Sequence, residues 1–257
     1  MQLQRRSVLS ALAAAAVCPI CLARGASAEE GHGHEAKWTY EGEGGPNQWG
    51  QLTPSFQSCS IGIQQSPINL AQPVQADIAK LKVDWKSFPL AVSNNGHTIV
   101  VNVPPGSSIS EGDEIYSLAQ FHFHHPSEHL LDGAALPMEV HFVHFNAAKS
   151  AALVLGIFIV EGAANQALEQ IFSNLPKESG EVKTALTFDP HKLLPAKHER
   201  YRYEGSLTTP PCSEIIHWNV LRAAITASAE QIKTFAAVFS NNARPILPLN
   251  RRFLLRG

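Results

Sequence analysis

The chain has 257 residues, with 20 basic and 22 acidic side chains and 44% hydrophobic residues. This near balance of charge, without a basic stripe, disfavours nucleic-acid binding, and the length fits one β-rich or mixed domain with a substantial core. The chain has no internal repeat, low-complexity linker or composition shift that would mark a second folded domain.

Residues 1–28 have the pattern of an export signal. Arg5 and Arg6 form a charged start, an almost wholly apolar run follows over 8–17, and Ala26-Ser27-Ala28 fits a small-residue cleavage site. The apolar run is too short to span a bilayer as a helix, and no later stretch is a second candidate. The paired arginines leave twin-arginine and Sec export open.

Cleavage after Ala28 would leave residues 29–257 as one domain, which we expect to be periplasmic or secreted. Its net charge would be −5 with His neutral, because residues 1–28 hold three of the basic residues and none of the acidic ones. The two cysteines that remain, Cys59 and Cys212, predict a disulfide in an exported protein, with two free thiols as the alternative. Such a bridge would stabilise the fold by about 4–5 kcal/mol in the chain-entropy model.

Short strands dominate the patterns in the rest of the chain. A turn over 64–69 leads into a short strand, and two strands over 90–103 are broken by the turn signature Asn94-Asn95-Gly96. Residues 139–145 are rich in Val and Phe, which favour strands. The apolar run 153–160 suits a central buried strand.

Helices are predicted to be few and short. Asn165 can cap a helix that runs to about Leu175. Ser228, with Gln231 three residues later, forms a capping box for a second helix that ends near Phe239. Together with the strands, these patterns predict one mainly β (α+β) domain with peripheral helices.

Two of the predicted strands carry histidines at a spacing that suits a metal ion. Aromatic and polar residues alternate over 120–124, so that Gln120, His122 and His124 share one face of a strand. Residues two apart on a strand stand about 7 Å from each other, and His141 on a neighbouring strand would add a third imidazole. Three imidazoles with an open fourth position are typical of catalytic zinc. Histidines on a solvated strand face remain the alternative.

A hydrogen-bonding residue precedes a histidine by two positions on each of these strands. Gln120 precedes His122, and Glu139 precedes His141. From these positions a side chain can orient a metal ligand through its second ring nitrogen. This pattern favours the metal site over the solvated face.

Several blocks of the sequence resemble the α-class carbonic anhydrases, of the bacterial exported type. In chain order the blocks are Asn94-Asn95-Gly96-His97, Gln120-Phe-His-Phe-His124, Ser127-Glu128-His129, Glu139-Val-His141-Phe-Val-His144, Ser206-Leu-Thr-Thr-Pro-Pro211 and Asn242-Ala-Arg-Pro-Ile246. The likeness runs from about Trp38 to Arg252. It implies a single domain with a large, twisted, mostly antiparallel central sheet.

The resemblance implies a zinc lyase that reversibly hydrates carbon dioxide to bicarbonate and a proton by attack of zinc-bound hydroxide. The Zn²⁺ ligands would be His122, His124 and His141. Three groups would orient these ligands, namely the side chains of Gln120 and Glu139 and the backbone carbonyl of Asn242.

The resemblance also assigns the residues that act on the nucleophile and the substrate. Thr208 would accept a hydrogen bond from the hydroxide and donate its own hydrogen to Glu128, because an ionised carboxylate only accepts. Thr208 and Thr209 would receive bicarbonate. An apolar wall for carbon dioxide maps onto Val143, Val154, Leu207, Trp218 and Ile216, for which ordinary core packing is the alternative.

The remaining assignments concern the proton and the structural residues. His97 aligns with the proton shuttle of the family, and an exposed turn histidine is the alternative. His129 matches a position that hydrogen-bonds a tyrosine, here Tyr203, whereas His144 is expected to point away from the metal. Bacterial members carry a bridge similar to the pair Cys59 and Cys212.

Two other function classes can be weighed against this one. A non-catalytic relative is disfavoured because all three predicted zinc ligands are present. The other class is a general metallo-hydrolase for esters or phosphoesters. Phosphoester hydrolysis usually needs a second metal or a cationic clamp, and no Lys or Arg stands in the blocks nearest the predicted metal. The expected partners are carbon dioxide and bicarbonate, without nucleic acid or a membrane span in the mature form. A homodimer is left open.

Overall fold

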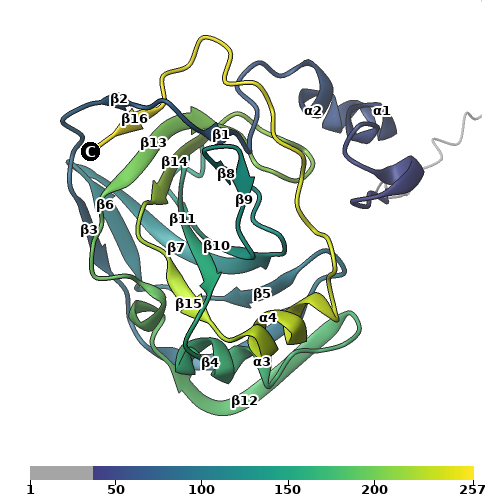
Figure 1. Cartoon of the computed structure of the whole chain (residues 1–257), viewed down its shortest axis with the longest axis vertical. Coiled ribbons are helices and arrows are strands. Elements are labelled where there is room, and N and C mark those ends of the chain that lie inside the picture. Colours follow the sequence, from purple (N-terminus) through teal and green to yellow (C-terminus); the bar gives the residue numbers. More distant parts are fainter. Residues whose placement is uncertain (1–36) are drawn as a thin grey trace, which may run out of the picture. The chain divides into compact units, whose positions relative to one another are not determined.

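The computed structural model describes residues 37–257, so the predicted signal segment, 1–28, lies outside the described residues. A sheet of 13 strands dominates this part of the chain. Ten of its strands form one path, in the order β12-β4-β5-β7-β10-β11-β14-β13-β16-β2 (Figure 1). The bounds of these strands are Val74–Gln75 (β2), Phe88–Asn94 (β4), Ile99–Asn102 (β5), Glu114–His124 (β7), Met138–Phe145 (β10), Ala152–Glu161 (β11), Gly180–Phe188 (β12), Arg200–Gly205 (β13), Ile216–Leu221 (β14) and Leu255–Arg256 (β16).

Three further strands join this sheet, and three form a small sheet of their own. β15 (Ile225–Ala227) pairs with β11, while β6 (Ser108–Glu111) pairs with both β7 and β3 (Leu81–Asp84). The small sheet has the order β1-β8-β9, with bounds Asn69–Leu70 (β1), Leu130–Leu131 (β8) and Ala134–Ala135 (β9).

Most pairings in the large sheet are antiparallel, which confirms the predicted fold class. The parallel pairs are β11 with β14, β11 with β15, and β16 with β2. β11 is paired on both sides, and its first eight residues are buried. This burial explains the apolar run that predicted a central strand. The predicted strand over 139–145 is β10.

The turn predicted at Asn94-Asn95-Gly96 connects β4 and β5. The side-chain oxygen of Asn94 accepts a hydrogen bond from the amide of Gly96 at 2.8 Å, and that of Asn95 accepts one from the amide of His97 at 3.0 Å. Gly96 has φ +85°, a left-handed conformation that glycine adopts without strain. Within the turn, the asparagine side chains therefore accept hydrogen bonds from backbone amides that no longer pair with a neighbouring strand.

The α-helices are short, as predicted, with bounds Trp49–Leu52 (α1), Ser58–Ile61 (α2), Gln166–Phe172 (α3) and Ala229–Ala236 (α4). Turns of 3₁₀-helix occur at Gly42–Gly44, Pro54–Phe56 and Pro190–Leu193. Asn165 caps α3 and the Ser228–Gln231 capping box begins α4.

Both longer helices end a few residues before their predicted ends. Pro176, which cannot continue a helix, follows α3 closely. Beyond α4, the amide of Phe239 still bonds to the carbonyl of Phe235 at 3.0 Å, so the chain makes one more irregular turn there.

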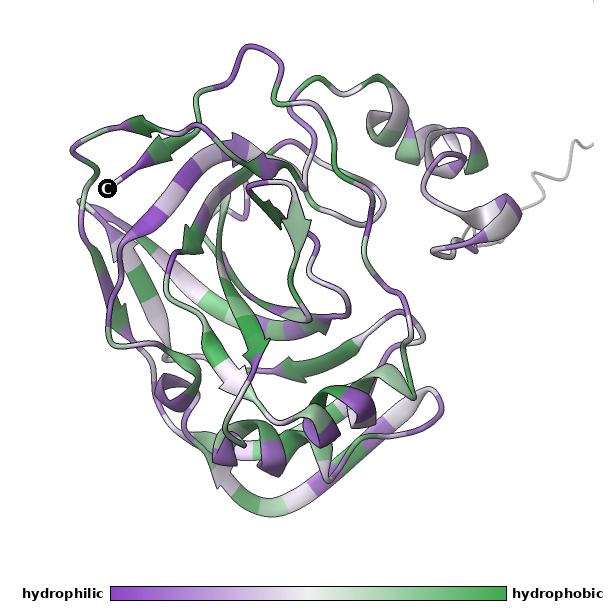
Figure 2. Ribbon diagram, viewed as in Figure 1, coloured by the Kyte–Doolittle hydropathy of each residue, from purple (hydrophilic) through white to green (hydrophobic). Residues whose placement is uncertain are grey.

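Helices α3 and α4 pack on the face of the sheet that carries the phenylalanines of β7. The ring centroid of Phe123 lies 5.3 Å from that of Phe172 in α3 and 6.1 Å from that of Phe235 in α4. Along both helices hydrophobic and hydrophilic residues alternate at helical spacing (Figure 2). Because side chains alternate along a strand, this packing leaves His122 and His124 on the opposite face.

The predicted disulfide between Cys59 and Cys212 is confirmed, with an S–S distance of 2.03 Å. It joins α2 to the loop that follows β13. Within residues 37–257, no helix is long and apolar enough to cross a membrane.

His144 lies on β10 and faces away from the other histidines, as expected. Its Nε2 accepts a hydrogen bond from Trp85 Nε1 at 3.1 Å, and its Nδ1 lies 3.0 Å from the carbonyl oxygen of Phe142. The side chain is fully buried. This burial lowers the pKa of His144 to about 4.

We expect His144 to make the folded state less stable in acid. The unfolded chain takes up this proton near the ordinary pKa of about 6.5, whereas the folded chain does so only near about 4. Up to about 3 kcal/mol of the free energy of unfolding should therefore be lost as the pH falls between these values. Urea unfolding of the wild type and of His144→Gln at pH 7.5 and 4.5 tests this. An equal loss in both proteins would contradict it.

Candidate metal centre

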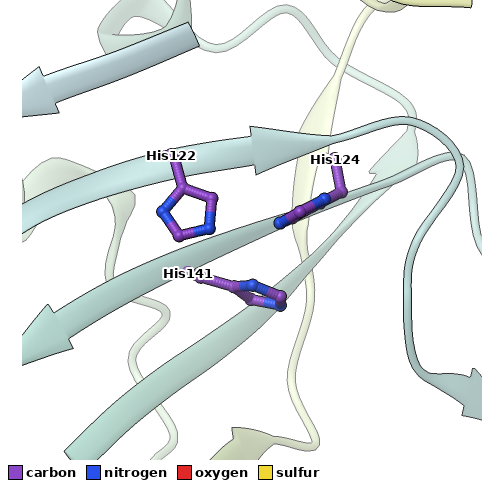
Figure 3. Close-up of side chains that lie close together, drawn as sticks. All are labelled: His122, His124 and His141. Carbon is purple, nitrogen blue, oxygen red and sulfur yellow. The ribbon is translucent and has the colours of Figure 1, made fainter. Parts of the chain in front are cut away.

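Three histidines converge on one face of the large sheet (Figure 3). Strands β7 and β10 are antiparallel neighbours, with His122 directly opposite His141 and His124 opposite Glu139. One nitrogen of each histidine lies within 4.8 Å of those of the other two. The structure thus brings together the three histidines that the sequence predicted as metal ligands.

Hydrogen bonds to the outer nitrogens of His122 and His124 show which nitrogen of each ring faces the centre. Nδ1 of His122 lies 2.9 Å from Gln120 Oε1, and Nδ1 of His124 lies 2.8 Å from the backbone oxygen of Asn242. Because these oxygens only accept, both Nδ1 atoms carry a hydrogen and both Nε2 atoms keep a free lone pair.

In His141 the two ring nitrogens exchange roles, so that Nε2 is the outer nitrogen. Its Nε2 lies 2.9 Å from Glu139 Oε1. This contact has the distance of a hydrogen bond but not its angle, since Nε2 has no aligned partner among the described residues. The carboxylate nevertheless marks Nε2 as the nitrogen that carries a hydrogen, which leaves Nδ1 to face the centre.

The donor set fits a zinc ion. Nε2 of His124 is buried and has no hydrogen-bond partner within residues 37–257. Leaving a buried acceptor without a partner costs about 1–3 kcal/mol, and a metal ion in the centre would satisfy it. Three imidazole nitrogens from one sheet face are the ligands that zinc takes in catalytic sites.

Burial sets the protonation of the rings. It lowers the pKa of His122 well below the ordinary value, with the neighbouring histidines adding to the shift, and it also lowers the pKa of His124. Burial lowers the pKa of His141 as well, but the adjacent Glu139 carboxylate outweighs it and the net shift is upward. His122 and His124 are therefore neutral at neutral pH, which is the form that binds metal.

Glu139 is fully buried and is satisfied by its neighbours. Its Oε2 accepts the backbone amides of Glu128 and His129 at 3.0 and 2.9 Å, and its Oε1 lies 2.8 Å from His129 Nδ1. Burial raises the pKa of Glu139, but His129 and His141 outweigh burial and bring it well below its usual range. The expected partner of His129 is also found, since its Nε2 lies 2.7 Å from the hydroxyl of Tyr203.

Glu128 lies beside the metal-facing nitrogens. Its Oε1 accepts the backbone amide of Arg244 at 2.9 Å. Its Oε2 lies 3.5 Å from His124 Nε2 and 3.8 Å from His141 Nδ1, and has no hydrogen-bond partner in the described part of the chain. The expected hydrogen bond from the hydroxyl of Thr208 to Glu128 is not present among residues 37–257 in this structure.

Thr208 and Thr209 lie on the loop between β13 and β14, and Thr208 is buried. The amide of Leu207 bonds to the carbonyl of Ser213 at 3.0 Å, and the amide of Cys212 bonds to that of Thr209 at 2.9 Å. The disulfide of Cys212 adds a covalent constraint. The loop is therefore held at both ends.

The predicted apolar wall lies in one row across the sheet. Val143 pairs with Val154, which in turn pairs with Trp218, and all three are buried in the same apolar cluster. Ile216 lies two residues before Trp218 in this cluster, and the partly buried Leu207 packs against it. The row begins at Gln120, which is paired with Val143.

His97 lies in the turn after β4 and is partly exposed. Its ring stacks on Trp38, with centroids 3.6 Å apart and planes 7° apart. Burial lowers the pKa of His97. The sequence placed Trp38 at the start of the family likeness but did not predict this contact.

Comparison with known proteins decides the family. A model of the eukaryotic-type carbonic anhydrase family matches residues 44–256. Carbonic anhydrases of Pectobacterium carotovorum and Neisseria gonorrhoeae are 45% and 41% identical, over 85% and 87% of this chain and 90% and 89% of theirs. The chain belongs to the carbonic anhydrase family.

A solved structure agrees with this assignment. The α-carbonic anhydrase of Thermovibrio ammonificans, in complex with the inhibitor sulfanilamide, superimposes with a TM-score of 0.83 at 42% identity, covering 86% of this chain and 99% of that one. The chain is therefore an α-class carbonic anhydrase, an enzyme of a zinc-dependent family that hydrates carbon dioxide.

Two features of this carbonic anhydrase were missed by reasoning from the sequence. Arg244 contacts Glu128 through its backbone amide, although no Lys or Arg was placed in the sequence blocks nearest the predicted metal. Its guanidinium bonds to Gln65, Ser66 and Cys59 and offers no clamp for a phosphate at the centre. Arg244 stands in the block 242–246 that carries the family likeness, but no local pattern shows which groups its guanidinium contacts.

Gly156 is the second feature, and it did carry a signal. A lone glycine inside an apolar strand pattern often marks a close approach. Gly156 is paired with His141 in the sheet. A Cβ atom at this position would lie 2.9 Å from Glu139 Oε1 and 3.3 Å from a methyl carbon of Val220.

We expect Gly156→Ala to weaken metal retention in this carbonic anhydrase by roughly ten- to 100-fold, because it displaces the carboxylate that orients His141. Competition with a chelator measures this. The matched control is Gly162→Ala, whose Cβ would lie 2.9 Å from a methyl carbon of Thr226, remote from the histidines. Equal affinities in both variants would show that Glu139 accommodates the added methyl group.

Proposed function

We propose that this carbonic anhydrase holds one zinc ion through Nε2 of His122, Nε2 of His124 and Nδ1 of His141. The observation that carries the proposal is the buried Nε2 of His124, which has no hydrogen-bond partner within residues 37–257 and lies within 4.8 Å of one nitrogen from each of the other two rings. Zinc held by three imidazoles lowers the pKa of bound water to about 7, the value known for carbonic anhydrases, and so supplies hydroxide at neutral pH.

The side chains around the centre would fix the direction of attack. The hydroxyl of Thr208 accepts a hydrogen bond from the nucleophile and donates to Glu128 Oε2, the oxygen that lacks a partner among the described residues. Thr209 shares the binding of bicarbonate. Val143, Val154, Leu207 and Trp218 supply the apolar wall that an uncharged substrate needs.

His97 would carry the proton away from the site. A group of pKa about 7 loses protons to water at only about 10³ s⁻¹, even with diffusion-limited return. Carbonic anhydrases reach about 10⁶ s⁻¹, so a nearby base must accept the proton first. An imidazole of pKa about 6.5 or lower accepts it and passes it to buffer, and His97 is partly exposed to solvent.

Export from the cytoplasm is also part of this proposal. The signal pattern of residues 1–28 and the disulfide between Cys59 and Cys212 support a periplasmic or secreted enzyme made of residues 29–257. The mass of the intact exported protein tests the cleavage site after Ala28.

Loss of one ligand should release the metal. We expect purified His141→Ala to hold well under one zinc per chain and to lose detectable hydration of carbon dioxide. Sulfanilamide, the inhibitor in the Thermovibrio complex, should no longer bind. The control is His191→Ala, which alters an exposed histidine. Full activity with stoichiometric zinc in His141→Ala would refute the ligand assignment.

Removal of the proton acceptor should slow only proton release. In dilute, bulky buffer, His97→Ala should lower maximal turnover at least roughly tenfold, while isotope exchange between carbon dioxide and bicarbonate at equilibrium hardly changes. Added imidazole should restore turnover. His198→Ala, at another exposed histidine, serves as the control. Unchanged turnover in weak buffer would mean that the proton leaves by another route.

A further inference from the structure

Glu128 depends on one backbone amide for its orientation in this structure. The amide of Arg244 donates to Oε1 at 2.9 Å, which leaves Oε2 facing the histidines. We infer that Arg244 is a positioning residue for Glu128, because its buried guanidinium anchors the segment that presents this amide. The inference rests on the proposed role of Glu128 as the acceptor of the Thr208 hydroxyl.

The guanidinium of Arg244 is fixed by three different acceptors. Its Nη1 donates to Gln65 Oε1 at 2.9 Å and to the carbonyl of Ser66 at 2.8 Å, and its Nη2 donates to the carbonyl of Cys59 at 3.1 Å. The guanidinium carbon also lies 5.4 Å from the ring centroid of Trp49. Only 3% of Arg244 is exposed. A group held this way cannot move without breaking several bonds at once.

These acceptors are themselves bonded to the loop that carries Thr208. Gln65 Nε2 donates to the carbonyl of Cys212 at 3.0 Å, and Cys212 is joined to Cys59 by the disulfide. The amide of Ser66 donates to Ser206 Oγ at 2.9 Å, two residues before Thr208. Arg244 therefore ties Glu128 to the loop that carries its proposed partner. The two residues of the proposed Thr208–Glu128 hydrogen bond are therefore both anchored to the same set of bonded residues around the disulfide.

The charge of Arg244 is consistent with this role. Burial lowers its pKa to about 10, while the negative charge of Glu128 opposes the shift, so that the guanidinium remains charged at neutral pH. Removal of the guanidinium would leave two backbone carbonyls and an amide oxygen without their donor. The 242–246 segment would then be free to shift, and the carboxylate with it.

The test compares Arg244→Met in two backgrounds. In the wild-type background kcat/KM for carbon dioxide hydration should fall about ten- to 100-fold, as expected when a catalytic group is displaced by about 1 Å. In a Glu128→Gln background the further loss should be under about twofold, because the carboxylate that Arg244 positions is already gone. Zinc content, measured in parallel, should stay at one ion per chain in all four proteins.

Two further variants separate positioning from general stability. Arg244→Lys keeps one charged donor and should recover part of the lost kcat/KM. If Arg244→Met does not fold, Arg244→Lys replaces it in the comparison between the wild-type and Glu128→Gln backgrounds. Arg252→Met removes a similar guanidinium, which bonds to three carbonyls and lies 5.5 Å from the ring centroid of Tyr203. It should lower the midpoint of urea unfolding without lowering kcat/KM.

Three outcomes would overturn the inference. Equal losses in both backgrounds would mean that Arg244 acts on the fold and not on Glu128. Wild-type kcat/KM in Arg244→Met would mean that the amide stays in place without the guanidinium. Glu128→Gln without any loss would remove the proposed role of Glu128 itself, and that result identifies the proposed function as the step that failed.

Discussion

The pairing of β7 with β10 is the constraint on which the rest of the site depends. It sets His122 opposite His141 and His124 opposite Glu139, so that the three histidines and one carboxylate come from two neighbouring pairs of residues in a single strand ladder. A shift of one residue in this register would move the histidines to the other face. Phe123, which lies between His122 and His124, opposes such a shift, since its ring packs against Phe172 of α3 and Phe235 of α4.

Around this ladder, the buried charges are held by main-chain groups and paired side chains. Glu139 accepts two backbone amides and lies against two histidines. Glu128 accepts one amide with Oε1, and its Oε2 has no hydrogen-bond partner among residues 37–257. A carboxylate buried without such partners would take up a proton instead of remaining charged. Main-chain donors and paired side chains thus stabilise the buried charge of Glu139, and a main-chain amide holds Glu128 beside the three histidines.

Much of the fold and the candidate site could be predicted from local patterns. Alternation over 120–124 placed His122 and His124 on one face, and the even pair of exported cysteines predicted the disulfide. Both patterns work because strand geometry and oxidising chemistry act on the residue types themselves. The ends of α3 and α4 were placed too late, because helix ends are decided by the loops and packing around them.

The sequence by itself determined the strand faces, the caps of the helices and, through the order of its blocks, the family. Only the tertiary structure decided which nitrogen of each ring faces the centre, that Gly156 leaves room for Glu139, and that Arg244 connects Glu128 to the disulfide. These relations join residues that are far apart in the chain, as Arg244 and Cys59 are. No local period can encode them, because the distance between two such groups is set by how the whole sheet and its loops pack.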